Sequence, residues 1–224
     1  MALDKECIAS YFSLKDCFSN LSFRVKFSQL HPDYFYPSGL ILFTGAQGHG
    51  KTLSAVRYLD NLCKKYPKAK IISNISLSLP HYKNEYYPYD DIEKIDIYDN
   101  GEYGLILFID EIQVEFASME SRNLPPSILQ KISQQRKRRL HIVGTTQLFG
   151  RVAKPFREQC NSVIDCSSYF NLIQINSVID FSSVTEDING NLKDYKYSGR
   201  YFWFRGSRFF DYYDTFNLVK RSRK

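Results

Sequence analysis

A glycine-rich stretch has the residue types and the spacing that bind phosphate groups. It fits the pattern G-x-x-x-x-G-K-[ST] and consists of Gly45, Ala46, Gln47, Gly48, His49, Gly50, Lys51 and Thr52. Glycine permits backbone conformations that other residues avoid, so successive N–H groups can face an anion. Lys51 would bring a mobile charge to the β- and γ-phosphates, and Thr52 a hydroxyl to Mg²⁺. The stretch therefore predicts a site for ATP and Mg²⁺.

An apolar run that ends in two adjacent acids supplies a second part of the site. The run is Leu105–Ile109, and Asp110 and Glu111 follow it. At the tip of a strand, Asp110 would hold Mg²⁺ directly or through water. Glu111, one residue on, would polarise the attacking water. The alternative is a strand that simply ends in solvated acids, and the glycine-rich stretch favours the catalytic interpretation.

A third segment, Leu140–Gln147, is an apolar run that ends in small polar residues. In an open α/β sheet the ligand lies beyond the carboxyl ends of the strands. Gln147 or Thr146 is therefore a candidate for contact with the γ-phosphate or the lytic water. Capping of the strand end by these side chains is the simpler alternative.

The net charge of +6 is unevenly distributed along the chain. Residues 121–157 contain nine basic residues and no acid, whereas residues 85–102 contain seven acids and one lysine. An acid-free stretch suits contact with a phosphate backbone, although it is equally typical of a solvated face. An arginine supplied by a neighbouring subunit can accelerate phosphoryl transfer by roughly 10³–10⁵. The candidates for that role are Arg136 first, then Arg138 and Arg157. The candidate DNA contacts are Lys137, Arg139, Arg151 and Lys154.

Short apolar strands alternate with helices along the middle of the chain. Strands are expected over 40–43, 70–76, 105–109, 140–145 and 162–166, and helices over 3–21, 52–65 and 127–138. This pattern predicts an α/β fold with a mostly parallel sheet flanked by helices, as in RecA- and FtsK-like P-loop NTPases.

The pattern changes after residue 167. Residues 171–181 and 195–204 alternate and flank a turn, which predicts a small antiparallel β extension. Its aromatic residues could stack on single-stranded DNA, but half-buried hairpin faces are the favoured interpretation. We therefore expect an N-terminal segment (1–36), a P-loop core (37–167), a hairpin extension (168–219) and a basic tail (220–224).

Composition excludes several classes of protein. Hydrophobic residues make up 43% and charged residues 24%, as in globular proteins. No apolar run reaches the length of a membrane span, and the first ten residues lack a signal-peptide pattern. The five cysteines include no C-x-x-C pair, which argues against a disulfide framework or a zinc site. These features predict a cytoplasmic protein.

The motifs together resemble the FtsK/HerA branch of P-loop ATPases. The closer resemblance is to zonular occludens toxin-like phage assembly proteins and to viral genome-packaging ATPases of the tectivirus type. It rests on Gly45–Thr52, Leu105–Glu111, the Gln135–Arg138 segment that leads into His141–Gln147, and the Arg151-Val152 and Phe156-Arg157 pairs. A weaker trait is Ser73–Ile75 at the end of the second strand.

This resemblance implies a homo-oligomeric ring, hexameric or pentameric, that moves double-stranded DNA or drives virion assembly with ATP. Its partners would include a capsid or portal protein, or a phage membrane protein, and it would act in the host cytoplasm or at the virion vertex. Toxin-like relatives usually continue into a transmembrane helix and an outer domain, and their absence here favours a soluble packaging motor. The alternatives are an assembly or secretion ATPase acting on a protein or membrane partner, and a small-molecule kinase.

Overall fold

The computed structural model describes residues 14–83, 86–119, 124–180, 184–187, 190 and 192–213. The chain divides into two compact units, Met1–Tyr34 and Phe35–Lys224. In the first unit, helix α2 (Leu14–Leu30) has no buried residue, and the Phe27 ring stacks on His31. The helix expected over 3–21 is therefore wrong at its end, because no Gly or Pro interrupts the chain before Pro32. Its beginning, the basic residue Arg122 and the tail 220–224 lie outside the described residues.

The second unit is built on an eight-stranded sheet with the strand order β10-β7-β6-β1-β5-β4-β2-β3. Its strands are β1 (Gly39–Thr44), β2 (Lys70–Ser73), β3 (Tyr86–Pro88), β4 (Leu105–Ile109), β5 (Leu140–Thr146), β6 (Cys160–Tyr169), β7 (Ile173–Asp180) and β10 (Lys196–Phe204). The six strands from β3 to β6 in this order are parallel, and β7 and β10 are antiparallel additions. Strands β8 (Thr185–Glu186) and β9 (Leu192–Lys193) form a separate pair. The predicted fold class is confirmed.

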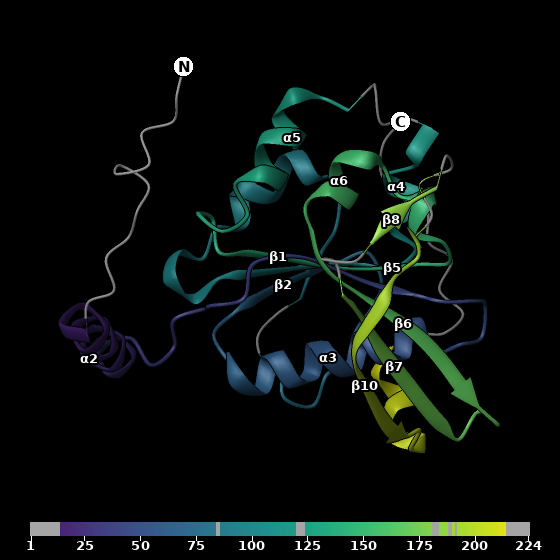
Figure 1. Cartoon of the computed structure of the whole chain (residues 1–224), viewed down its shortest axis with the longest axis horizontal. Helices are drawn as coiled ribbons and strands as arrows, with labels where there is room; N and C mark the ends of the chain where they lie inside the picture. Colours follow the sequence, from purple (N-terminus) through teal and green to yellow (C-terminus); the bar gives the residue numbers. More distant parts are fainter. Residues whose placement is uncertain are drawn as a thin grey trace. The chain divides into compact units, whose positions relative to one another are not determined.

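Helices cover both faces of the sheet (Figure 1). One face carries α3 (Lys51–Lys65) and the 3₁₀ turn η6 (Ser207–Tyr212), and the other carries α4 (Ile112–Glu115), α5 (Pro126–Ser133), α6 (Lys154–Glu158) and η1 (Ile92–Tyr98). Further 3₁₀ turns are η2 (Gly101–Tyr103) and η4 (Phe149–Arg151).

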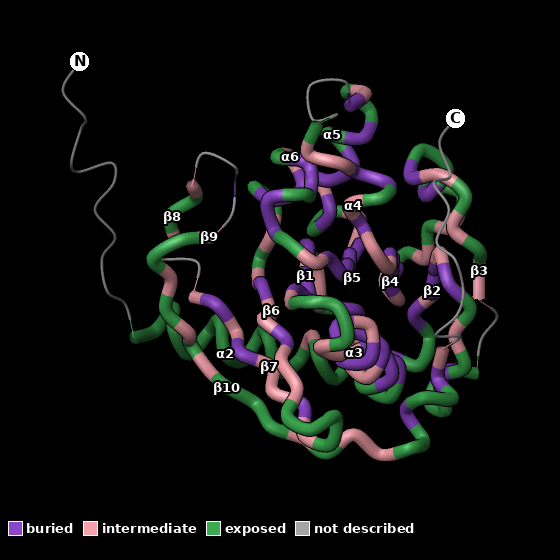
Figure 2. The backbone as a smooth tube through the Cα atoms, turned by 90° about the vertical axis from the view of Figure 1, so that its right-hand side faces the viewer, coloured by how far each residue is buried: buried purple, intermediate pink, exposed green. Residues whose placement is uncertain are grey.

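The central strands have apolar side chains on both sides because they are covered on both sides. Alternate residues of β4 point to opposite layers. Leu107 packs with the layer of α5 and α6, and Ile106 and Phe108 pack with α3. Figure 2 shows the resulting buried centre along β1, β5 and β4. This explains why the sequence shows short continuous apolar runs instead of polar–apolar alternation.

Two elements end earlier than the sequence predicts. Helix α5 stops at Ser133 instead of Arg138, because the Leu140 N–H donates to the Gln135 carbonyl and Arg139 takes a positive φ of 48°. Strand β2 stops at Ser73 instead of Ser76, because the Ser73 hydroxyl exchanges hydrogen bonds with the backbone of Ile75. No helix in the described part of the chain is long and apolar enough to cross a bilayer.

Candidate functional site: a phosphate-binding loop and an acidic strand end

The glycine-rich loop joins the carboxyl end of β1 to the amino end of α3. Gly45, Gly48 and Gly50 have φ angles of 141°, 77° and 74°, in the left-handed range that favours glycine. Lys51 begins α3, is 7% exposed, and donates from Nζ to the Ala46 carbonyl oxygen at 3.1 Å. Its ammonium group therefore spans the loop. The loop backbone and the positive end of the α3 dipole face the same edge of the sheet.

Three parallel strands bring their carboxyl ends to this edge. Thr44 pairs with Thr146 in the β1–β5 register, and Ile109 pairs with Gly144 in the β4–β5 register. The residue that follows β4, Asp110, therefore lies beside both the loop and the end of β5.

Asp110 accepts hydrogen bonds from two hydroxyl groups. Thr52 Oγ1 donates to Asp110 Oδ1 at 2.8 Å, and Thr145 Oγ1 donates to the same oxygen at 2.7 Å. Burial raises the pKa of Asp110, and the two hydroxyl donors and the nearby Lys51 act in the opposite direction. The two residues predicted to hold Mg²⁺, Thr52 and Asp110, are thus in direct contact. Thr145 was not singled out from the sequence, which favoured its neighbours Thr146 and Gln147.

Glu111 follows in an unusual backbone conformation. Its φ of 53° and ψ of 50° are left-handed, which is uncommon for a residue other than glycine. Its N–H donates to Thr145 Oγ1 at 2.9 Å, and its carboxylate accepts a hydrogen bond from Gln113 Nε2. These contacts fix the backbone from which the carboxylate projects, at the edge of the sheet where the loop lies.

Asn74, directly after β2, holds the backbone of Asp110 from the other side. Its Nδ2 donates to the Asp110 carbonyl oxygen at 2.9 Å, and its Oδ1 accepts from the Asp110 N–H at 2.8 Å. The amide thereby replaces the strand partner that Asp110 loses where β2 ends. The sequence pointed to this residue only as a family trait.

Gln147 lines a cavity of about 490 Å³ together with Gly45, Ala46 and Gln47. The cavity lies beside the glycine-rich loop and extends to Asp165 on β6. Other lining residues are Thr44, Leu148, Phe149, Ile179, Leu192 and Tyr195. Gln147 is thus placed where a group at the loop is within its surroundings. Thr146 is fully buried, and its hydroxyl donates to the Leu148 carbonyl oxygen at 3.0 Å.

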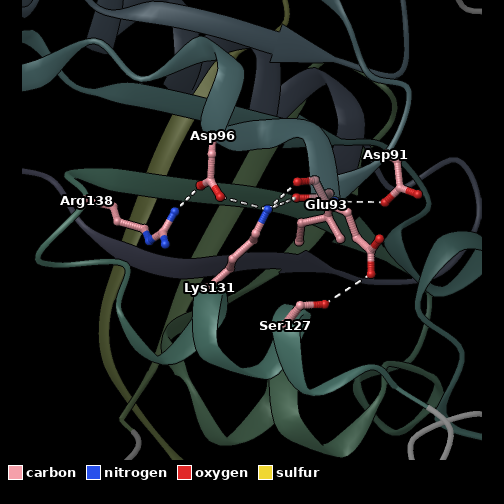
Figure 3. A network of polar contacts seen from close by, with 7 residues as sticks. Asp91, Glu93, Asp96, Ser127, Lys131 and Arg138 are labelled. Carbon is pink, nitrogen blue, oxygen red and sulfur yellow. Dashed lines mark hydrogen bonds and ion pairs between the residues drawn. The ribbon is translucent and has the colours of Figure 1, made fainter.

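Two of the candidate arginines are engaged within their own chain. Arg157 is 8% exposed and donates to the carbonyl oxygens of Gly150 and Val152 and to the carboxylate of Glu186, the last at 3.1 Å. Arg138 pairs with Asp96, which also accepts an ion pair from the buried Lys131 at 3.0 Å (Figure 3). These side chains fasten elements of the fold together.

Arg136 and Lys137 are exposed in the turn between α5 and β5. This turn precedes the amino end of β5, whereas the glycine-rich loop lies at the carboxyl end. Strand β5 has seven residues, so about 20 Å separate the two edges. Arg136 is therefore too distant to reach phosphates held by the loop of its own chain.

The remaining basic candidates do not gather in one place. Arg139 donates to the Gly101 carbonyl oxygen at 3.3 Å near the amino end of β5. Arg151 is exposed after the carboxyl end of β5, on the side of the loop. Lys154 begins α6 and lies 3.7 Å from Glu158. The candidate DNA contacts thus fall on both edges of the sheet.

The loop, the strand-end carboxylates and the sheet order define the fold of a P-loop NTPase. The residues present suit Mg²⁺, because a threonine hydroxyl and a carboxylate meet within hydrogen-bonding distance at the foot of the loop. Hard oxygen donors of this kind are the ligands that Mg²⁺ prefers. Thr52 and Asp110 are the residues that would hold it.

The chain belongs to the zonular occludens toxin (Zot) family, whose model matches residues 39–187. It is similar to the crystal structure of the N-terminal domain of zonular occludens toxin from Neisseria meningitidis, with 18% identity and a TM-score of 0.55. That match covers 80% of this chain and 100% of the other. The predicted resemblance is confirmed.

Two further solved structures are similar. One is an ATPase domain with 9% identity and a TM-score of 0.50, and the match covers 86% of this chain and 95% of the other. The genome packaging NTPase B204 from Sulfolobus turreted icosahedral virus 2, in complex with ATP-gammaS, has 19% identity and a TM-score of 0.47, covering 60% and 76%. No curated protein matches the chain.

Proposed function

We propose that this protein is an ATP-hydrolysing motor that translocates or packages phage DNA during virion assembly. One observation carries the proposal: Asp110 at the end of β4 meets Thr52 at the foot of the glycine-rich loop, with Glu111 next to it. A phosphate cradle, a pair of oxygen ligands and a second carboxylate thereby share one edge of the sheet. This set suits attack by water on a phosphoanhydride better than transfer to an organic acceptor.

Each residue has a part in this reaction. The loop N–H groups and Lys51 would bind the β- and γ-phosphates, so that charge developing during transfer meets fixed donors. Glu111 would take a proton from the attacking water, and Gln147 would orient that water or the γ-phosphate. Mg²⁺, when bound to Thr52 and Asp110, supplies charge that offsets the phosphate oxygens.

We further propose that the active form is a ring, hexameric or pentameric, in which Arg136 completes the site of a neighbouring subunit. Arg136 is exposed, and its side chain makes no hydrogen bond or ion pair with the described residues. Since it lies at the edge opposite its own loop, only another subunit's phosphates are within its reach. Arg138 and Arg157 are weaker candidates because each is already paired within the chain.

A first experiment tests the chemistry. The wild-type protein, Lys51→Ala and Glu111→Gln are compared for binding of a non-hydrolysable ATP analogue and for ATP turnover. Lys51→Ala should lose binding, because it removes the charge that spans the loop. Glu111→Gln should bind normally and turn over at least about a hundredfold more slowly, since general-base catalysis contributes 10²–10⁴. Unchanged turnover in Glu111→Gln would remove that residue from the mechanism.

A second experiment tests the arginine. Lys51→Ala and Arg136→Ala subunits are mixed over a range of ratios without DNA. Mixed rings would pair an intact loop with an intact arginine, so hydrolysis should exceed that of either variant alone. Lys137→Ala, which removes the adjacent exposed cation, is the matched control and should hydrolyse ATP normally by itself. No recovery at any ratio would argue against a role in trans.

A third experiment separates a DNA motor from the alternative, an assembly or secretion ATPase acting on a protein or membrane partner. A DNA motor should hydrolyse ATP faster with duplex DNA, and its DNA affinity should fall steeply between about 50 and 200 mM salt. The exposed cations Arg136, Lys137 and Arg151 support this choice. Turnover that ignores DNA but responds to a phage membrane, capsid or portal protein would favour the alternative. Action in the host cytoplasm or at the virion vertex remains part of the proposal.

A further inference from the structure

The outer side of the glycine-rich loop rests on two side chains from the antiparallel extension. Gln174 on β7 is completely buried, and its Nε2 donates to the His49 carbonyl oxygen at 3.0 Å. Arg205, directly after β10, donates from Nε at 2.8 Å and from Nη2 at 2.6 Å to Gln174 Oε1. The guanidinium thereby fixes the orientation of the amide that binds the loop. Figure 1 shows β7 and β10 running side by side.

Gly50 lies directly against this pair. A Cβ atom on Gly50 would be 2.2 Å from Arg205 Nη2 and 2.3 Å from Gln174 Oε1. The backbone at the start of α3 therefore packs on the two side chains with no room for a larger residue. The φ of 74° at Gly50 is held from outside the loop by this contact as well as by the loop's own sequence.

The extension contacts the start of α3 at a second point. Ser54 Oγ donates to Asn176 Oδ1 at 2.9 Å, and Asn176 lies two residues after Gln174 on the same face of β7. At the other end of the pair, Arg205 Nη1 donates to Asn171 Oδ1 at 3.3 Å. The hairpin thus fastens the loop and its helix at two successive positions.

We propose that Gln174 and Arg205 are positioning residues that hold the His49–Gly50 backbone in its phosphate-binding shape. Neither would touch the nucleotide, since both lie on the side of the loop that its carbonyl groups face. The inference rests on the proposed nucleotide site and assigns its support to the extension. Arg205 lies beyond residues 39–187, the range matched by the family model. A loop held in shape before binding gives up less conformational freedom when phosphate arrives.

The first test measures nucleotide affinity by calorimetry, with an ATP analogue that resists hydrolysis and Mg²⁺. Arg205→Ala should weaken binding about tenfold, because it removes charge-assisted hydrogen bonds that orient Gln174. Arg205→Lys should be intermediate, since an ammonium group cannot donate in two directions from one plane. Arg200→Ala is the matched control: Arg200 is exposed on β10 and stacks on Tyr197 at 4.8 Å. It should bind as the wild type does.

The second test needs no nucleotide. Amide hydrogen exchange over residues 45–51 should become faster in Arg205→Ala, while exchange in the central strands stays unchanged. Gln174→Leu combined with Arg205→Ala should weaken binding no more than the stronger single variant, since the two side chains act as one unit. A uniform rise in exchange would indicate global destabilisation and overturn a positioning role.

The outcomes separate the two levels of inference. If the wild-type protein binds no nucleotide, the proposed function fails, and the exchange experiment still decides whether the pair holds the loop. If the wild type binds and Arg205→Ala binds equally well, the positioning role is wrong and the proposed function stands.

Discussion

Replacing Thr145 with valine should loosen the acidic end of the site while leaving its shape intact. Thr145 is fully buried, and its hydroxyl donates to Asp110 at 2.7 Å and accepts from the Glu111 N–H at 2.9 Å. Valine has nearly the same volume and no hydroxyl, so the substitution removes two hydrogen bonds without leaving a cavity. The backbone conformation of Glu111, with φ of 53°, also loses its support.

The expected cost follows from these two contacts. A hydrogen bond to a charged group contributes about 1.5–3 kcal/mol, and an N–H left without an acceptor costs about 1–3 kcal/mol. A loss of about 3 kcal/mol in the free energy of unfolding is therefore expected, against a total of about 5–15 kcal/mol for a typical domain. Any ATP turnover should fall about tenfold or more, since each 1.4 kcal/mol at the transition state is tenfold in rate.

The assay is urea unfolding of Thr145→Val and Thr145→Ser, together with their ATP turnover. Serine keeps the hydroxyl and loses one methyl group, so it should cost about 1 kcal/mol and leave turnover near that of the wild type. Equal stability and equal turnover in the two variants would refute the role given to the hydroxyl. A valine variant as stable as the wild type would do so as well.

Two further predictions concern the fold. The pKa of His141 is lowered to about 4 by burial, with Nδ1–H donating to the Gly39 carbonyl oxygen at 3.1 Å and Nε2 2.9 Å from the Tyr58 hydroxyl. Since its unfolded pKa is about 6.5, the unfolded state takes up the proton first. Stability should fall by about 3 kcal/mol as the pH drops from 6.5 to 4. In unfolding titrations, His141→Gln should lack this part of the pH dependence, and an unchanged slope would contradict the assignment. Gly104→Ala should lower the free energy of unfolding by about 2–4 kcal/mol, because φ is 74° and the new Cβ would lie 2.2 Å from the buried Phe35 ring. A thermal transition at the wild-type temperature would show that this contact yields without cost.

Much of the site could be predicted because its parts are contiguous in sequence. The loop and the first turn of α3 form one continuous segment, and Asp110 and Glu111 directly follow an apolar strand. The choice within Thr145, Thr146 and Gln147 could not be made in the same way. Successive residues of a strand point to opposite faces, and only the pairing of Ile109 with Gly144 determines which hydroxyl meets Asp110.

Charge was the least informative signal in the sequence. Arg136, Arg138 and Arg157 look alike as basic residues in an acid-free stretch. Tertiary structure exposes the first, pairs the second with Asp96 and buries the third beside Glu186. Burial and pairing depend on elements distant in sequence, which no local pattern encodes.

The sequence by itself determined the chemistry this protein can offer: a phosphate cradle, a carboxylate at a strand end, and the alternation of strands and helices that gives a mostly parallel sheet. Tertiary structure decided which distant side chains support that chemistry. Asn74 reaches Asp110 because β2 and β4 are neighbours, and Gln174 reaches His49 across 125 residues because the antiparallel extension folds back on the loop. Local sequence specifies conformation over a few residues, whereas strand order and register, fixed by packing of the whole sheet, determine which residues meet.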